Sequence, residues 1–162
     1  LVEWALEDWA AASGGRLIWK RASSPIGALF HIRWAAPHDQ QHGVAQPFLS
    51  GRRHGSTIRI RPDLSRFPGA VGERGRADAL YRDTVVYLTA LHELGHGLGM
   101  NHAAAPGPIM YNGRLLPQVF SRYRTRLKSR SDIRRFSAVT EFDRNRLSAL
   151  LFARSTTSRP PE

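Results

Sequence analysis

The stretch LHELGHGLGMNH, residues 91–102, places three histidines and a glutamate among three glycines. His92 and His96 are four residues apart. On a helix with about 3.6 residues per turn, their side chains lie on one face and can reach one ion. Glycine readily adopts left-handed backbone angles, so Gly99 can end the helix and turn His102 back toward the same ion. The stretch therefore predicts a metal site made by three imidazoles.

Residue types limit the metal and its chemistry. The chain has no cysteine, which excludes a thiolate metal site, a disulfide framework and a thiol nucleophile. Neutral imidazoles suit zinc, whose catalytic sites use three protein ligands and leave the fourth position to water. Glu93 follows the first histidine directly, where the HExxH zinc-hydrolase motif has its general base. Gly95 and Gly97 have no ligand role, and we expect them to let another segment pack closely against the helix.

The spacing of these residues is specific. At this chain's His and Glu frequencies, the pattern HExxHxxGxxH arises by chance with a probability of roughly one in twenty thousand. Histidines held only by ordinary hydrogen bonds are therefore a poor interpretation of residues 92–102. For the other four histidines, each taken singly, ordinary packing is the preferred interpretation. These four are His31, His38, His42 and His54.

The composition describes one packed domain with an excess of basic side chains. A chain of 162 residues with 41% hydrophobic residues and four tryptophans can bury a core of its own. No apolar run is long enough to cross a bilayer, so no membrane contact is expected. The net charge of +11 permits a polyanionic partner such as nucleic acid. A solvated arginine-rich surface is the preferred interpretation, because charge governs association and not fold.

Before the histidine stretch, the sequence alternates between helix and strand patterns. Helical spacing of apolar residues predicts a helix in residues 1–13, stopped by Gly14 and Gly15. Four segments have strand character: RLIWK (16–20), ALFHIRWAAP (28–37), GVAQPF (43–48) and STIRIRP (56–62). Pro47 places its segment at a sheet edge. Gly, Pro and Arg in residues 63–82 predict a loop, followed by a helix over 83–99.

After the stretch, glycines and prolines predict irregular structure over residues 101–113. The segment SRYRTRLKSRSDIRR, residues 121–135, is strongly basic. Thr140 and Asp143 form an N-cap pair for a final helix over residues 139–152. Its leucines at 147, 150 and 151 are expected to face the core. Residues 154–162 are expected to be a disordered tail.

HELGHGLGMNH followed by PIMY (108–111) resembles the metzincin zinc endopeptidases, and most closely the matrixin-like catalytic domain. Met110 corresponds to the methionine of the turn beneath the metal. The resemblance implies an α+β domain over residues 1–153, with a twisted mixed β-sheet, an active-site helix and a C-terminal helix. Matrixin-like domains have a first strand before the first helix, and this sequence starts at that helix, so that strand is expected either to be missing from this sequence or to lie elsewhere.

The resemblance implies a zinc-dependent endopeptidase. His92, His96 and His102 would bind zinc, and Glu93 would act as the general base for attack of a zinc-bound water on the peptide bond. Val44 and Ala45 would pair with an extended substrate through main-chain hydrogen bonds. A secreted or extracytoplasmic protein acting on peptides or proteins is expected, although the chain carries no targeting segment of its own.

The sequence departs from the matrixin pattern in its other metal positions. Gln46 stands where a ligand histidine of a second zinc is expected, and IRIRP (58–62) has arginines in place of acidic calcium ligands. One zinc is therefore expected, without structural calcium or a second zinc. Tyr111 is adjacent to Met110 rather than two residues beyond it, so a tyrosine ligand of the astacin type is not expected.

Alternative interpretations remain open at this point. A zinc-bearing binding module would use the basic segment 122–135 to hold nucleic acid or an acidic polymer, and a non-peptidase HExxH hydrolase would use the same ligands. A further pair of alternatives concerns residues 111–138, which would form the wall of the substrate pocket. Either apolar side chains such as Leu115, Leu116 and Phe120 line an ordinary pocket, or an arginine reaches in and favours acidic substrates.

Overall fold

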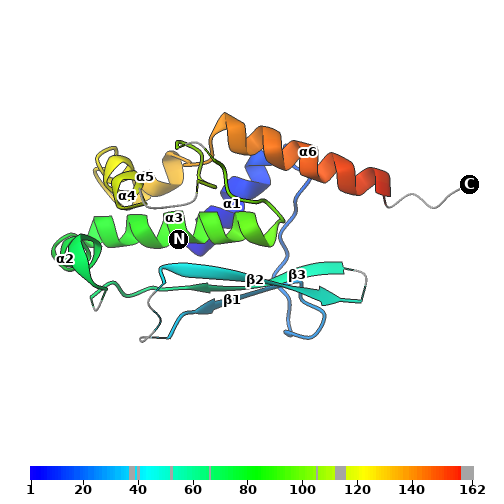
Figure 1. Cartoon of the computed structure of the whole chain (residues 1–162), viewed down its shortest axis with the longest axis horizontal. Coiled ribbons are helices and arrows are strands. Elements are labelled where there is room, and N and C mark those ends of the chain that lie inside the picture. Colours follow the sequence, from blue (N-terminus) through cyan, green and yellow to red (C-terminus); the bar gives the residue numbers. More distant parts are fainter. Residues whose placement is uncertain are drawn as a thin grey trace, which may run out of the picture.

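A computed structural model describes residues 1–36, 39, 41–51, 53–65, 67–104, 106–111 and 116–157. Its elements follow one another along the chain as α1 (Val2–Ala12), β1 (Phe30–Trp34), β2 (Gly43–Ser50), β3 (Arg53–Ile60), α2 (Gly69–Ala77), α3 (Ala79–Gly97), α4 (Leu116–Arg124), α5 (Ser131–Arg135) and α6 (Glu141–Thr157). Helix α3 crosses one face of the sheet, and α1, α4, α5 and α6 lie on the far side of α3 (Figure 1). This α+β arrangement agrees with the predicted fold class.

The sheet is mixed, as predicted. Its described strands are ordered β1-β3-β2, with β1 parallel and β2 antiparallel to β3. The edge position predicted for the segment containing Pro47 is confirmed, because β2 pairs with β3 on one side only. The strand predicted over residues 16–20 is wrong. These residues form no ladder, and Trp19 packs edge-on against Phe30 with ring centroids 5.0 Å apart instead.

The core lies between α3 and its two neighbouring layers. Ile58 and Ile60 of β3 are fully buried on the sheet side, and Trp9 of α1 is fully buried on the other. The Trp9 indole Nε1 donates a hydrogen bond to the Leu91 carbonyl at 2.8 Å, which satisfies its one polar atom within the core. This bond fixes α1 on the helix that carries the histidines.

Two boundaries before the histidine stretch differ from the prediction. Residues 69–77, expected as part of a loop, form α2. Its Gly72 and Gly75 allow the helix to pack directly on Leu64 and Phe67, so glycine marks close packing here rather than a break. Helix α3 begins at Ala79, earlier than predicted, and its N-cap is Asp78, which accepts the Tyr81 N–H.

The basic segment is largely helical, and the final helix extends further than expected. Residues 121–135 contribute to α4 and α5. Helix α6 begins after Thr140 as predicted, Leu147 is fully buried, and Leu150 and Leu151 pack against the core. Residues 154–157, expected in the tail, continue α6, whereas 158–162 lie outside the described residues. The disorder of the last residues and the domain limits stay predictions.

Candidate metal centre and active-site pocket

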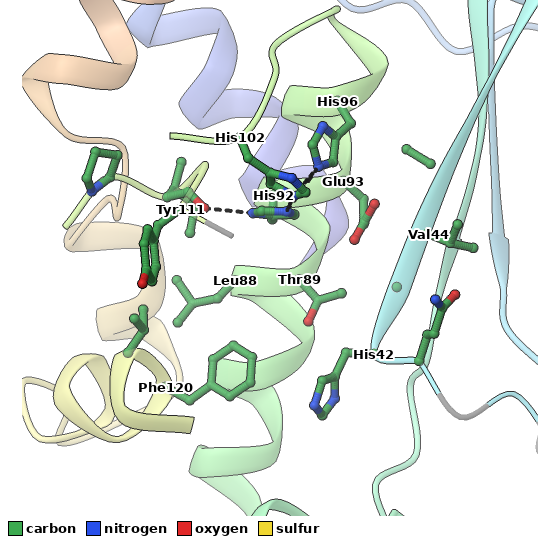
Figure 2. A pocket seen from close by; sticks show the side chains of 16 residues that line it. His42, Val44, Leu88, Thr89, His92, Glu93, His96, His102, Tyr111 and Phe120 are labelled. Carbon is green, nitrogen blue, oxygen red and sulfur yellow. Dashed lines mark hydrogen bonds between the residues drawn. The ribbon is translucent and has the colours of Figure 1, made fainter. Parts of the chain in front are cut away.

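Three imidazoles converge at the end of α3. The Nε2 atoms of His92 and His96 are 3.1 Å apart, and that of His102 lies 3.2 Å from the first and 3.0 Å from the second. Gly99 has φ +93° and lies just past the last turn of α3, between the second and third histidine. The structure thus brings the three predicted ligands together by the left-handed glycine that the sequence pattern required. Figure 2 shows the three rings facing one another.

Backbone carbonyls set the protonation of two rings. Nδ1 of His92 lies 2.7 Å from the Ile109 carbonyl, and Nδ1 of His96 lies 2.8 Å from the Met100 carbonyl. A carbonyl only accepts, so each Nδ1 carries the proton and each Nε2 presents a lone pair. Zinc bound tetrahedrally at about 2.0–2.1 Å per nitrogen requires nitrogens about 3.3 Å apart. The donor set therefore fits a zinc ion held by three Nε2 atoms.

The electrostatics also favour neutral imidazoles. Burial, together with the neighbouring His96 and His102, lowers the pKa of His92 to about 4. Burial and His96 likewise lower the pKa of His102. Metal ligation requires the deprotonated imidazole, so these rings are in the binding form at neutral pH.

Glu93 lies beside the imidazoles in a tight, dry setting. Only 8% of its surface is exposed, and burial raises its pKa to about 7 against the opposing hydrogen bond from the Ala45 N–H. Strand β2 approaches closely at Gly43, where a Cβ would lie 2.5 Å from Thr89 Cγ2 and 2.7 Å from Glu93 Cγ. The absence of a side chain at Gly43 therefore lets the strand edge and the carboxylate meet.

Met110 packs against α3 at Gly95, next to the second histidine, and its assignment to a Met-turn stays a prediction. Its side chain is fully buried, and a Cβ on Gly95 would lie 2.3 Å from its sulfur. The buried Asp143 carboxylate accepts the Ile109 N–H at 3.0 Å and the Met110 N–H at 3.4 Å. Sequence reasoning found Asp143 only as a helix cap. Its second role joins residues more than thirty positions apart, and no local pattern signals it.

The histidines and Glu93 open into one pocket of about 420 Å³. Both residues predicted to contact substrate, Val44 and Ala45, line it. Its lining among the described residues is Gln41, His42, Gly43, Val44, Ala45, Leu88, Thr89, His92, Glu93, His96, His102, Pro108, Ile109, Tyr111, Val119 and Phe120.

The lining bears on the two alternatives for the pocket wall. Phe120 lines the pocket as the apolar alternative expected, and no arginine of the described residues does. Leu115 lies outside the described residues, and the side chain of Leu116 is not described. His42 was not predicted as a pocket residue, because it is an isolated histidine in a loop-like stretch and belongs to no motif.

The basic segment is largely engaged within the molecule. Arg124 pairs with Asp78 at 2.8 Å, Arg130 with Asp83 at 2.9 Å, and Arg134 with Glu7 at 3.0 Å. Further guanidinium groups stack on rings, with the Arg126 carbon 5.4 Å from the Phe136 centroid. These contacts hold α4, α5 and the turn between them against α1 and α3.

Within the described residues, the histidines at 92, 96 and 102 form the only group of three or more His, Asp or Glu side chains able to hold a metal ion. The expectation of one zinc without structural calcium stays a prediction, because part of the chain is not described. None of the described helices combines the length and hydropathy that crossing a membrane requires.

Comparison with known proteins identifies the family. The family model for Matrixin, peptidase family M10, matches residues 5–133, which is most of the chain and includes every residue of the candidate metal centre. Searches of the curated proteins and of the solved structures gave no significant match. The chain belongs to the matrixin family of zinc-dependent endopeptidases.

Proposed function

We propose that this chain is a zinc-dependent endopeptidase whose zinc is held by His92, His96 and His102. The observation that carries the proposal is the convergence of three Nε2 atoms within 3.0–3.2 Å of one another, next to the buried carboxylate of Glu93. With two Nδ1 protons directed at carbonyls, the lone pairs that meet at this point repel one another unless a cation lies between them.

The chain's own residues supply the proton transfers. A zinc ion bound here would lower the pKa of water and polarise the substrate carbonyl. Glu93 would take a proton from the attacking water at its carboxylate and deliver it to the leaving amine. The Ala45 N–H holds that carboxylate, and burial keeps competing water away. Hydrolysis in this scheme needs no nucleophilic side chain, in keeping with a chain that lacks cysteine.

Strand β2 would hold the substrate backbone. One side of β2 pairs with β3, and Val44 and Ala45 line the pocket. An extended peptide can add to such an edge through main-chain hydrogen bonds, which would align its scissile bond with Glu93. A secreted or extracytoplasmic site of action is proposed from the family alone.

Two substitutions separate ligand from base. Glu93→Ala should keep zinc and lose nearly all peptidase activity, because it removes the base and leaves the imidazoles intact. His102→Ala should fold and hold zinc weakly. The measurements are zinc content after dialysis and chelator-sensitive cleavage of a peptide library, with exposed His54→Ala on β3 as the matched control. Full zinc content in His102→Ala, or loss of zinc in Glu93→Ala, would contradict these roles.

The rival binding function has less support. Arg124, Arg130 and Arg134 form ion pairs within the molecule. Their positive charges are therefore less available to bind a polyanion. Salt-sensitive DNA binding without peptide cleavage would favour that rival over the peptidase.

A further inference from the structure

His42 lies in the active-site pocket, although the proposed chemistry does not use it. It directly precedes Gly43, the residue at which β2 meets α3 beside Glu93. Figure 2 shows His42 and Phe120 together at the end of the pocket away from the three clustered histidines. If a substrate side chain entered beside Glu93 and extended along the pocket, the end of that side chain would contact His42.

Aromatic neighbours hold the His42 ring in place. It stacks on Phe67 with centroids 4.0 Å apart and rings inclined by 22°, and it meets Phe120 edge-on at 5.5 Å. Burial, and to a smaller extent the nearby Arg61, lower its pKa to about 4. The end of the pocket is therefore a fixed, neutral imidazole at physiological pH.

The His42 ring adds polar atoms to a pocket whose described lining also includes the polar residues Gln41, Thr89 and Tyr111. Its Nδ1 is buried away from solvent and has no hydrogen-bond partner among the described residues, so a substrate group would have to bond to the ring through Nε2. The pocket walls between the metal centre and His42 are mainly apolar, formed by Leu88, Val119 and Phe120, with the Thr89 side chain on α3. Leu88 and Thr89 lie one helical turn, about 5.4 Å, before the first ligand and Glu93. The pocket thus has apolar side chains at Leu88, Val119 and Phe120, and His42 places a polar ring beside Phe120.

We propose that His42 is a specificity-determining residue, and that the pocket selects a long, uncharged substrate side chain ending in a hydrogen-bonding group, such as tyrosine or glutamine. The proposal rests on the proposed peptidase function and on this pocket receiving the residue that follows the scissile bond. A fully apolar side chain of the same shape would displace solvent from the accessible edge of the imidazole without offering a hydrogen bond in return, which is unfavourable. A cationic side chain would be repelled by the nearby charge of Arg61.

Matched pairs of substrates isolate this effect. Tyrosine and phenylalanine differ by one hydroxyl group, and glutamine and methionine have nearly the same length. A single neutral hydrogen bond predicts a kcat/KM ratio of roughly three- to tenfold for tyrosine over phenylalanine and for glutamine over methionine.

The experiment measures these ratios with zinc-loaded protein on peptides that differ only after the scissile bond. The wild type is compared with His42→Leu, which keeps bulk and removes hydrogen bonding, and with His42→Gln, which restores a neutral polar end. His54→Leu, at an exposed histidine outside the pocket, controls for the substitution itself. We expect both ratios to fall to one or below in His42→Leu, to stay above one in His42→Gln, and to be unchanged in His54→Leu.

Each outcome decides a distinct point. Absence of chelator-sensitive, Glu93-dependent cleavage by the wild type would overturn the proposed function and this inference with it. Cleavage with wild-type ratios of one or less would overturn the inference alone, even if the His42 variants fail to fold. Unchanged ratios in a folded His42→Leu protein would do the same. Preference for glutamate over glutamine would mean that the end of the pocket selects a negative charge, through Arg61 or a protonated His42, which also contradicts the proposal.

Discussion

Gly95, Gly97 and Gly99 serve two different physical purposes within five residues. A Cβ on Gly95 would lie 2.3 Å from the Met110 sulfur, and one on Gly97 would lie 2.5 Å from Phe30 Cε1. These contacts confirm the prediction of close packing against the helix. Gly99 acts through its backbone instead, because its φ of +93° lies in a region that side chains disfavour. A side chain at Gly95 or Gly97 would disturb the packing on α3, whereas one at Gly99 would disturb the turn before His102.

At the residue scale, Gly99→Ala tests the turn that aims His102. Alanine at a left-handed position costs about 1 kcal/mol of folding stability. Gly14→Ala is a matched control, because Gly14 has φ +64° with open space around it and ends α1. Both variants should lose similar stability in urea unfolding, and only Gly99→Ala should lose zinc on dialysis. Equal zinc retention by both would show that the backbone at Gly99 does not control the third ligand.

At the scale of elements, the start of α6 is joined to the turn beneath the metal site. The Thr140 hydroxyl donates to Asp143 Oδ2 at 2.6 Å, and the Asp143 N–H donates back to that hydroxyl at 3.2 Å. The same carboxylate accepts the Ile109 and Met110 N–H groups. Because the Ile109 carbonyl faces Nδ1 of His92, one carboxylate supports both a helix cap and a ligand's orientation.

Substitution at these two positions separates the cap from the support. Thr140→Ala should cost about 1 kcal/mol of stability as an ordinary lost cap and leave zinc affinity nearly unchanged. Asp143→Ala leaves buried N–H groups unpaired, so we expect a loss of about 2–4 kcal/mol. Zinc affinity should fall about 10- to 100-fold, because the Ile109 carbonyl loses its anchor. Competition for zinc with a chelator measures this, and an unchanged affinity in a folded Asp143→Ala protein would rule out the support role.

At the scale of the whole molecule, the basic side chains behind the net charge of +11 lie in different environments. Several arginines between 122 and 135 meet carboxylates of α1, α3 and α5. The more exposed of these pairs contribute little singly, and their value lies in orienting α4 and α5 around the pocket. The buried Arg61 instead lies near His42, where it helps to keep the imidazole neutral.

The buried His42 predicts a pH dependence of global stability. Its pKa is lowered from 6.5 to about 4 on folding, so its contribution is fully present above pH 6.5 and is lost as the pH falls toward 4. At about 1.4 kcal/mol per pKa unit, the loss is at most about 3 kcal/mol. Urea unfolding at several pH values in chelator should show a steeper acid-side fall for the wild type than for His42→Leu. Identical pH profiles for the two proteins would contradict this assignment.

The sequence by itself determined the parts of this protein that depend on short-range geometry. The helical spacing of His92 and His96, the left-handed Gly99 and the cap at Thr140 are local features, because helical periodicity and backbone preference act within a few residues. The edge position of the strand with Pro47 follows from a missing N–H donor. These features were sufficient to predict that three histidines converge at the end of a helix, whereas the fold class came from the resemblance to matrixin-like domains.

Only the tertiary structure decided the rest, because it depends on contacts between distant segments. RLIWK has strand composition, yet a strand also needs a hydrogen-bonded neighbour, and these residues have no ladder in the described part of the chain. Helix α2 forms where glycine composition predicts a loop, since Gly72 and Gly75 gain packing on Leu64 and Phe67. His42 becomes part of the pocket only because β2, Phe67 and Phe120 meet there. Such contacts cannot be predicted from the spacing of residues in the sequence, because they depend on how whole helices and strands pack together.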